Sequence, residues 1–452
     1  MSKSRASMSR RKFFDLAAAT AGGALAAGSR LGAQSGPKSA NDRVRMALIG
    51  SGNRGRDVAG TFLRHHADVQ YVAACDAYKL RLDQGVQQLT ELQKNVKVES
   101  YEDYRRVLDR NDVDAVLIAT PDHWHCQMLI DAMAAGKDAY VEKPLSNTVE
   151  RSAQALRTYQ ASNRVVQIGT QQRSGEHFQE AAKIIQEGQL GKITHAVLQF
   201  GGTGYGTPAE PVAPEPAGLN WDLFQGPAPR HPFKPTRLRW RGWWDYGGGL
   251  ISDWGVHLTD VALWYLNAQR VGPQLTSGTA QYVNFVNPDR DQSPDAFSVS
   301  WQYPEFVMTF TNAVVQDWEF GRQGNYFFGP GGSLLVHRAG YEVRPEPPAA
   351  GRGQGGRGAA AQGRAGAGQN PEALQPAALR PRRVPWRDSG GADGSTVAHT
   401  RNFLDCVKSR QKPVSDLEIG FYASLPTLLA VMAIREGRSF KWDDGAKRAI
   451  PV

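Results

Sequence analysis

Short apolar runs and amphipathic stretches alternate along the chain from residue 44 onward. The runs Val44–Ile49, Val69–Cys75 and Ala115–Ala119 have the length and the flanking polar residues of buried strands. Helical spacing follows the first run over residues 56–65, and it follows the third as far as Ala135. Strands that alternate with helices in this way predict a parallel sheet with right-handed crossovers, which binds ligands at the carboxyl ends of its strands.

The second half of the chain has a different hydrophobic pattern, because several of its apolar runs alternate apolar and polar residues. Such alternation is typical of strands with one buried face. Helical spacing recurs over Leu250–Leu266, and near the end of the chain over Val397–Ser409 and Ile419–Arg435. The predicted strands are Lys192–Phe200, Ala280–Phe285, Ala296–Trp301, Val307–Asn312 and Ser333–His337. The chain is therefore expected to contain two α/β units.

A glycine-rich turn directly follows the first predicted strand. It has the pattern G-x-G-x-x-G, and the second strand ends in Asp76. The glycines permit a tight turn, a close backbone approach to a pyrophosphate, and close packing of helix on strand. Asp76 would accept hydrogen bonds from the adenosine ribose and repel a 2′-phosphate, so NAD is favoured over NADP. The turn residues expected at the cofactor are Gly50, Gly52, Asn53, Arg54 and Gly55.

Polar residues also follow the next two strands of the predicted sheet. Thr120, Pro121 and His125 come after one strand, and Glu142 and Lys143 come after the strand that ends at residue 141. The carboxyl ends of parallel strands meet at one edge, so we expect these residues at the nucleotide. For His125 the alternative is a loop histidine that is hydrogen-bonded to the backbone.

The predicted helix Leu250–Leu266 carries an acid and a histidine four residues apart. Asp253 and His257 share a face away from the apolar stripe that Trp254 and Leu258 begin. The three glycines before the helix let backbone approach a ligand closely. A surface pair without a role is the alternative. We favour catalysis, because an imidazole with a pKa of about 6.5 can exchange a proton near neutral pH.

Aromatic and arginine side chains cluster just before this helix. Trp240, Arg241, Trp244 and Tyr246 are candidates for substrate binding. Aromatic faces can stack on the apolar face of a sugar, while arginine donates to hydroxyl groups or to a carboxylate. The alternative is that these aromatic residues cover the core.

These motifs together resemble the Gfo/Idh/MocA oxidoreductases, the superfamily of glucose-fructose oxidoreductase and inositol dehydrogenase. The resemblance is carried by the turn at 50–55, by Ala119-Thr120-Pro121, by Glu142-Lys143-Pro144 and by the Asp253-x-x-x-His257 spacing. It covers roughly residues 43–345 and 396–445.

The resemblance implies an N-terminal Rossmann domain over 43–165 and a C-terminal α/β domain over 166–345, whose open-faced mixed sheet packs beside the nicotinamide. Residues 396–452 would pack back on the body. The implied cofactor is NAD, the implied substrates are sugars, polyols and their derivatives, and we expect a homo-oligomer.

The resemblance also implies roles for single residues. Lys143 would hold the reacting hydroxyl oxygen, His257 would move its proton, and Asp253 would fix the substrate or the imidazole. Gln172 and Arg173 match the family's interdomain segment and are expected to line the active site; solvated loop residues are the alternative.

The first 33 residues are typical of an export signal. Ser9-Arg10-Arg11-Lys12-Phe13-Phe14 precedes a weakly apolar stretch rich in alanine and glycine, which resembles a twin-arginine signal. A basic tail without that role is the alternative. The signal predicts a periplasmic or otherwise extracytoplasmic protein that is exported folded. No apolar run reaches the roughly 18 residues of a membrane span, so none is expected in the mature protein.

The formal net charge of +9 does not indicate a nucleic-acid partner, because the surplus lies in residues 1–33 and 345–387. Residues 346–395 are rich in glycine, arginine and alanine and are predicted to be a disordered insertion. Cys75, Cys126 and Cys406 lie far apart in the chain, so we expect buried thiols and no metal site.

The leading hypothesis is therefore an NAD-dependent oxidoreductase acting on a CH–OH group. The alternative is a redox-neutral glycoside lyase, hydrolase or epimerase that oxidises a hydroxyl transiently. Export favours this alternative because free NAD is scarce outside the cytoplasm, whereas the Asp-Trp-Gly-Val-His context at residues 253–257 differs from that of NAD-dependent glycosidases. A non-catalytic sugar sensor is disfavoured, because it would not need Lys143, Asp253 and His257 together.

Overall fold

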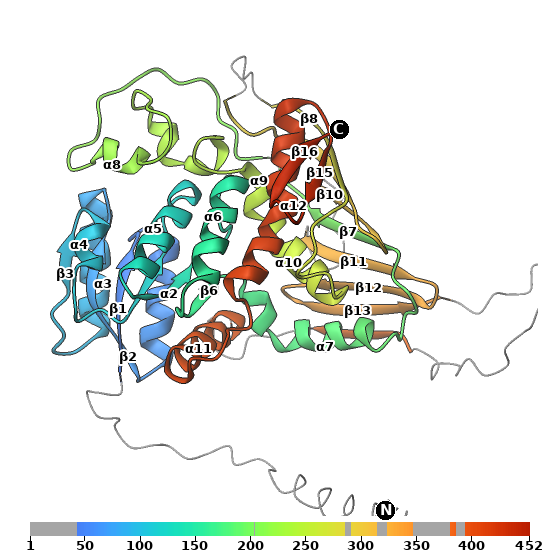
Figure 1. Ribbon diagram of the computed structural model, residues 1–452, viewed down its shortest axis with the longest axis horizontal. Coiled ribbons are helices and arrows are strands. Elements are labelled where there is room, and N and C mark those ends of the chain that lie inside the picture. Colours follow the sequence, from blue (N-terminus) through green and yellow to red (C-terminus); the bar gives the residue numbers. More distant parts are fainter. Residues whose placement is uncertain (1–42, 203, 285–290, 314–322, 347–379, 386–393) are drawn as a thin grey trace, which may run out of the picture. The chain divides into compact units, whose positions relative to one another are not determined.

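The computed structural model describes residues 43–202, 204–284, 291–313, 323–346, 380–385 and 394–452 (Figure 1). The predicted signal at 1–33 and most of the predicted insertion at 346–395 lie outside these residues.

The first sheet has six parallel strands in the order β3-β2-β1-β4-β5-β6. Its central strands are almost wholly buried, which is why they read as continuous apolar runs in the sequence. The predicted strands at 44–49 and 69–75 are confirmed at those residues. The bounds are β1 Val44–Ile49, β2 Val69–Cys75, β3 Glu99–Tyr101, β4 Ala115–Ile118, β5 Asp138–Val141 and β6 Val166–Ile168.

Helices connect these strands and cover both faces of the sheet, which makes this unit a Rossmann domain. Helix α6 begins where the side chain of Thr148 accepts a hydrogen bond from the backbone N–H of Arg151, a normal N-cap. The helices are α2 Asn53–His65, α3 Lys79–Leu92, α4 Tyr104–Leu108, α5 Asp122–Ala134 and α6 Val149–Gln160.

The second sheet has ten strands in the order β14-β13-β12-β11-β7-β10-β9-β8-β15-β16. Strands β7 and β10 are parallel and the remaining pairs are antiparallel, so the sheet is mixed, as expected. The bounds are β7 His195–Phe200, β8 Leu275–Gln281, β9 Ala296–Gln302, β10 Val307–Thr311, β11 Gln323–Gly329, β12 Gly332–His337, β13 Gly340–Pro345, β14 Arg382–Pro385, β15 Phe440–Asp443 and β16 Arg448–Pro451.

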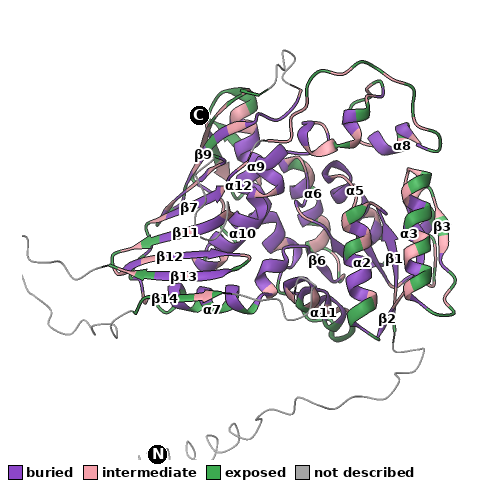
Figure 2. Ribbon diagram, turned by 180° about the vertical axis from the view of Figure 1, so that it is seen from behind, coloured by how far each residue is buried: buried purple, intermediate pink, exposed green. Residues whose placement is uncertain are grey.

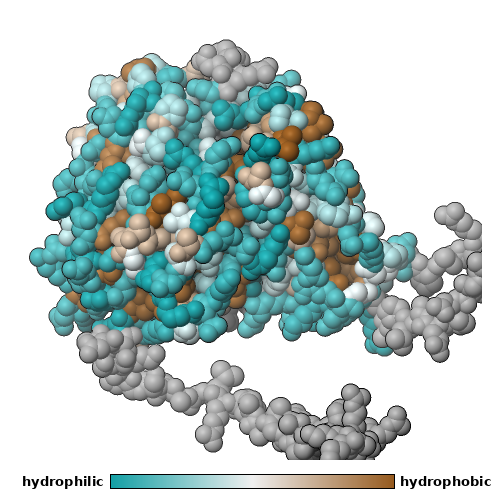
Figure 3. Space-filling view, viewed as in Figure 1, coloured by the Kyte–Doolittle hydropathy of each residue, from teal (hydrophilic) through white to brown (hydrophobic). Residues whose placement is uncertain are grey.

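Helices α7 (Glu176–Gln186), α10 (Gly255–Tyr265) and α12 (Leu417–Glu436) pack on one face of this sheet. Phe297, Val299 and Trp301 of β9 point into the core that they form. The alternate residues Ser298 and Gln302 are exposed on the other face. Figure 2 shows α10 and α12 as buried helices between the two sheets. In Figure 3, hydrophobic residues on the visible face form small groups among hydrophilic ones.

The C-terminal helices join the second domain to the first. Helix α11 (Gly394–Ser409) packs against α2, and its Arg401 donates to both oxygens of the buried Asp68 carboxylate. Helix α12 is capped by Asp416, whose carboxylate accepts from the Ile419 N–H. Within the described residues α12 is long and apolar enough to cross a membrane, but 83% of its apolar window is buried in the core.

Three features differ from the sequence expectations. Strand β14 lies inside the stretch 346–395 and extends the sheet by pairing with β13. Strand β8 lies about five residues before the predicted position, because its pairing with β9 begins at Leu275. Residues 204–248 form a long excursion with α8 (Trp221–Gln225), η3 (Pro235–Leu238) and η4 (Trp240–Gly242), drawn in yellow-green beside the first sheet in Figure 1.

Candidate active site

A cavity of about 870 Å³ lies where the carboxyl ends of β1, β2, β4 and β5 meet the 204–248 excursion and the start of α10. Its volume is within the range of small-molecule sites, about 300–1,000 Å³. It brings together most of the sequence-predicted site residues from both domains. These are Gly50, Gly52, Asn53, Arg54, Asp76, Thr120, Pro121, His125, Glu142, Lys143, Trp240, Arg241, Asp253 and His257.

The glycine turn has the geometry that its three glycines predict. Gly50 has a φ of +94°, and a Cβ there would lie 2.6 Å from the Ala119 carbonyl oxygen. A Cβ on Gly55 would lie 2.0 Å from the Gly50 carbonyl oxygen, so the first turn of α2 sits directly on the loop. At Gly52 the nearest atom to a Cβ is 3.7 Å away, which leaves the backbone open to the cavity.

Asp76 closes the far end of the turn. Its carboxylate accepts from the Ser51 N–H at 2.8 Å and from the Tyr78 N–H at 2.9 Å. Burial raises the pKa of Asp76, and these two donors and the nearby Arg81 partly offset that effect. The open glycine, the helix N-terminus of α2 and this acid at the end of β2 fit a dinucleotide.

Lys143 and Asp253 form the most heavily bonded pair of the cavity. The Lys143 ammonium donates to the Asp253 backbone oxygen and to its Oδ1, both at 2.7 Å. The first of these bonds explains why the predicted helix 250–266 is two helices, α9 (Gly249–Asp253) and α10. Because Lys143 takes the Asp253 carbonyl, the His257 N–H donates to the Trp254 oxygen instead.

His257 begins the next turn and is 4% exposed. Burial lowers its pKa well below the ordinary value, and the positive charges of Lys143, Arg338 and Arg54 lower it further. The imidazole is therefore neutral near pH 7. Its Nδ1 is buried and has no hydrogen-bond partner among the described residues. The residue lines the cavity, and its neutral imidazole is able to accept a proton from a molecule there.

The Asp253 carboxylate contacts further polar side chains of the cavity besides Lys143. Its carboxylate also accepts from the Tyr205 hydroxyl at 2.7 Å, and Arg241 lies 3.3 Å away. Although burial opposes ionisation, Lys143 and Arg241 hold the Asp253 pKa well below its usual range. Asp253 therefore stays ionised and orients the lysine, the tyrosine and the arginine around it.

Asp122, the first residue of α5, also lines the cavity and behaves differently. It is 1% exposed, and its Oδ1 has no partner among the described residues. Burial and the nearby Asp253 charge raise its pKa well above the ordinary value. The carboxyl group therefore holds its proton to a higher pH than an exposed aspartate does.

His125 is a loop histidine that is hydrogen-bonded to the backbone, which is the alternative to its predicted place at the nucleotide. Its two ring nitrogens lie 2.7 Å from the Pro144 carbonyl oxygen and 2.9 Å from that of Thr120. It thus ties together the loops after β4 and β5, one on each side of the cavity that it borders. Glu142 lies beside it along the edge and forms an ion pair with Arg54 at 2.9 Å.

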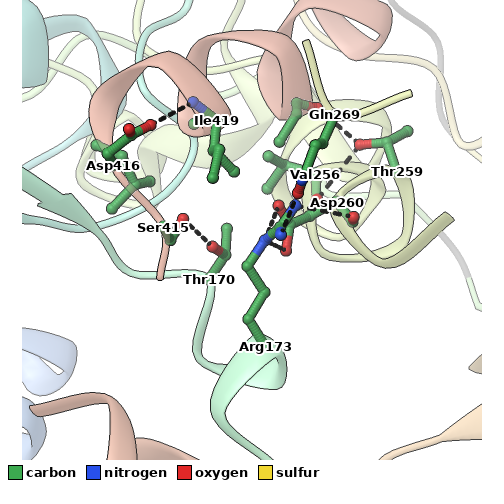
Figure 4. Close-up of polar contacts among 12 residues, drawn as sticks. Thr170, Arg173, Val256, Thr259, Asp260, Gln269, Ser415, Asp416 and Ile419 are labelled. Atoms are coloured by element: carbon green, nitrogen blue, oxygen red, sulfur yellow. Dashed lines mark hydrogen bonds and ion pairs between the residues drawn. The ribbon is translucent and has the colours of Figure 1, made fainter. Parts of the chain in front are cut away.

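Gln172 and Arg173 do not line the cavity, which corrects their predicted role. The Arg173 guanidinium donates to both oxygens of Asp260 at 2.8 Å and to Gln269 at 2.7 Å (Figure 4). The side chains of this ion pair are 4% and 1% exposed, so Arg173 anchors the segment after β6 to α10 of the second domain. Gln172 is buried beside it, and the neighbouring Gln171 lines the cavity instead.

Trp244 and Tyr246 also lie outside the cavity. They are core residues, which was the alternative to their predicted role in substrate binding. Trp244 packs in the core of the second domain with Leu250 and Leu258. Tyr246 is fully buried, and its ring centre lies 4.9 Å from that of His123. Gly55 does not border the cavity either, because its role is the packing of α2 on the turn.

Sequence reasoning missed several lining residues. Asp122 follows Thr120 and Pro121 directly and could have been found from that position. Tyr205 and Arg338 lie in segments with no local signal, and the fold alone brings them to the cavity. Trp254 was expected in the buried stripe, but it lines the cavity and stacks on Phe200.

Comparison with known families agrees with this arrangement. Over residues 44–170 the sequence matches the NAD-binding Rossmann fold of the GFO_IDH_MocA oxidoreductase family. Over residues 175–332 it matches that family's C-terminal alpha/beta domain.

Among curated proteins, an alpha-N-acetylgalactosaminidase from Shewanella oneidensis is 32% identical over 161 residues, which are 35% of this chain and 35% of that protein. The match thus spans about a third of that relative. Two solved structures share the fold. Aldose-aldose oxidoreductase from Caulobacter crescentus has a TM-score of 0.60 at 19% identity, covering 88% of this chain and 99% of that one. A WlbA dehydrogenase from Bordetella pertussis, in complex with NADH and UDP-GlcNAcA, has a TM-score of 0.60 at 16% identity, covering 89% and 99%.

Proposed function

Because the chain belongs to the Gfo/Idh/MocA oxidoreductase family, we propose that it is an NAD-dependent oxidoreductase acting on a CH–OH group of a sugar, polyol or glycoside. The observation that carries the proposal is the meeting of Lys143, Asp253 and His257 in the cavity that also holds the glycine turn and Asp76. The substrate class is supported by the two structural neighbours, which are an aldose-aldose oxidoreductase and a dehydrogenase in complex with UDP-GlcNAcA.

Gly52, the N-terminus of α2 and Asp76 would hold the pyrophosphate and the ribose of NAD, which when bound supplies a hydride acceptor. Lys143 uses two of its three N–H donors on Asp253, so one remains for a substrate hydroxyl oxygen. The neutral His257 would take the hydroxyl proton. The lysine charge would stabilise the developing negative charge on that oxygen.

Mass spectrometry of the nucleotide released from purified protein, followed by single-turnover measurements with a sugar panel, tests this function. We expect NAD in the released material and NADH formation with at least one sugar or polyol. Protein that neither contains nor binds NAD, measured by calorimetry, would refute the proposal.

A second candidate function is a redox-neutral glycoside cleavage, favoured by the relationship to alpha-N-acetylgalactosaminidase. Here Asp122, whose pKa is raised by burial and by the Asp253 charge, would donate a proton to the departing glycosidic oxygen. Product analysis separates the two functions. Cleavage releases a sugar from a glycoside with no net change in bound NAD, whereas oxidation converts one NAD to NADH for each molecule oxidised.

We also propose that the protein is exported folded through its Arg10-Arg11 pair, which lies outside the described residues. A tightly held cofactor would travel with it. Replacing both arginines by lysine should leave the protein in the cytoplasm, as cell fractionation would reveal. An unchanged extracytoplasmic location would refute the proposal.

We further propose a homo-oligomer that covers the outer face of the ten-stranded sheet. Tyr326 pairs with Val197 and Leu335 on neighbouring strands, and Phe328 on the same face is 43% exposed. Light scattering of the purified protein tests this proposal, and a monomer at micromolar concentration would refute it.

A further inference from the structure

The Asp253 carboxylate is held by a tyrosine that lies 48 residues earlier in the chain, in the 204–248 excursion. We infer that Tyr205 is a positioning residue for the proposed reaction: its hydroxyl group fixes the Asp253 carboxylate and, through it, directs the Lys143 ammonium at the substrate. This inference rests on the proposed function and names the side chain that sets the geometry of its lysine.

Each oxygen of the Asp253 carboxylate has its own donor. Oδ1 accepts from the Lys143 ammonium at 2.7 Å, and Oδ2 accepts from the Tyr205 hydroxyl at 2.7 Å. Arg241 lies on the Oδ1 side, 3.3 Å away. The side chain of Asp253 is 9% exposed, so little water reaches it. The carboxylate therefore cannot rotate about its Cβ–Cγ bond without losing a hydrogen bond that water does not readily replace.

The direction of the Lys143 ammonium depends on this carboxylate. Its bonds to the Asp253 backbone oxygen and to Oδ1 are both 2.7 Å long. An ammonium group has three N–H donors, so two fixed bonds set the direction of the third. If Oδ1 turned away, Lys143 would keep only the bond to the backbone, and its other donors could rotate. The Tyr205 hydroxyl thus acts on the substrate through Asp253 and Lys143.

The backbone around Tyr205 is packed too closely for the residue to shift. A Cβ on Gly242 would lie 2.3 Å from the Tyr205 carbonyl oxygen, so these two backbones touch only because residue 242 is glycine. Two residues further on, the Thr207 N–H donates to the side-chain oxygen of Gln292 at 2.8 Å. The Gln292 amide donates back to the Thr207 carbonyl oxygen at 3.0 Å. The segment that carries Tyr205 is therefore a rigid support, as the positioning of a catalytic group requires.

The alternative role for Tyr205 is packing alone. Its ring packs against the core of the second domain, as do Phe200 and Trp254. Packing needs only the ring, whereas the hydroxyl is bonded to an ionised carboxylate that lines the same cavity as Tyr205 itself. The two roles can therefore be separated by a substitution that removes the hydroxyl group and keeps the ring.

The variant Tyr205→Phe makes that separation. The measurement is single-turnover reduction of bound NAD by an excess of a sugar that wild type oxidises, with calorimetric affinities for NAD and for the sugar. We expect the rate constant to fall about ten- to hundredfold, because a shift of about 1 Å in a catalytic group can cost about 10²-fold. The fraction of NAD reduced and both affinities should stay within about twofold of wild type, because Tyr205 acts on the reaction step and not on binding.

The matched control is Tyr422→Phe. The Tyr422 hydroxyl also donates to an aspartate, Asp444, at 2.7 Å, and it accepts from Lys447 at 2.7 Å. Tyr422 is buried in the core of the first domain and does not line the cavity. Its loss should change the free energy of unfolding and leave the rate constant of NAD reduction as in wild type. If wild type cleaves glycosides without net NADH formation, the rate constant of cleavage is compared in the same variants.

A rate constant in Tyr205→Phe equal to that of wild type, or an equal fall in Tyr422→Phe, would overturn the inference and leave the proposed function standing. So would a smaller fraction of reduced NAD, or a weaker NAD affinity, at an unchanged rate constant, because a purely structural role produces that result. A wild-type protein that neither reduces its NAD nor cleaves a glycoside would overturn the proposed function, and this role with it.

Discussion

Removing Arg173 should destabilise the protein strongly, because the structure assigns this residue to a buried ion pair and not to substrate binding. In Arg173→Met the Asp260 carboxylate, 1% exposed, loses the cation that donates to both of its oxygens. Breaking one side of such a buried pair typically costs about 3–5 kcal/mol of the free energy of unfolding.

The loss should also depend on pH with a definite sign. Burial already raises the pKa of Asp260, and Arg173 is the main group that opposes this shift, with a smaller contribution from Thr170. Without the arginine the folded state binds a proton that the unfolded state releases, so the variant loses about 1.4 kcal/mol per pH unit as pH rises towards its new folded pKa.

Denaturant unfolding at about pH 5, just above the unfolded pKa of an aspartate, and at about pH 8, with Arg157→Met as an exposed control, measures both effects. The double variant Arg173→Met/Asp260→Leu should recover most of the stability, since it leaves no buried charge unpaired. A loss below about 1 kcal/mol in Arg173→Met, or an equal loss at both pH values, would refute this reasoning.

Three further predictions concern the glycine turn and the cavity beside it. Gly55→Ala should weaken NAD binding and lower stability, since its Cβ would lie 2.0 Å from the Gly50 oxygen; calorimetry with unchanged affinity would argue against the packing role. Asp76→Ala should relax discrimination against NADP, which a ratio of NAD to NADP affinity equal to that of wild type would contradict. If the protein cleaves glycosides, Asp122→Asn should slow the cleavage of substrates with poor leaving groups by roughly 10²-fold or more. In wild type the rate of cleavage should fall as pH rises through the raised pKa of Asp122, and Asp122→Asn should remove this fall. An unchanged pH–rate profile in Asp122→Asn would assign the proton to another group.

The first domain could be predicted closely because its signals are local. Buried parallel strands read as apolar runs, and β1 and β2 have the predicted bounds. The glycine turn and Asp76 follow from positions within one βαβ unit. Lys143 was also found, since the carboxyl edge of the sheet collects such residues, and Asp253 was found from its helical spacing to His257.

The remaining features depend on contacts between distant segments. The helix predicted over 250–266 breaks because Lys143, 110 residues away, takes the Asp253 carbonyl. Arg173 follows a strand like a lining residue, but its partner Asp260 is 87 residues further on and holds it away from the cavity. Arg338 reaches the cavity only because β12 and β13 place their turn there. Such partners have no signature near the residue that they redirect.

The most direct test of the proposed oxidation is single-turnover reduction of bound NAD by a sugar deuterated at the reacting carbon, in wild type, Lys143→Ala and His257→Ala. We predict a primary isotope effect on NADH formation in wild type. We also predict a rate at least about a hundredfold lower in each variant while NAD stays bound, because neither side chain belongs to the phosphate or ribose site. Reduction at the wild-type rate in both variants, or no reduction of bound NAD by any sugar or glycoside, would contradict the account.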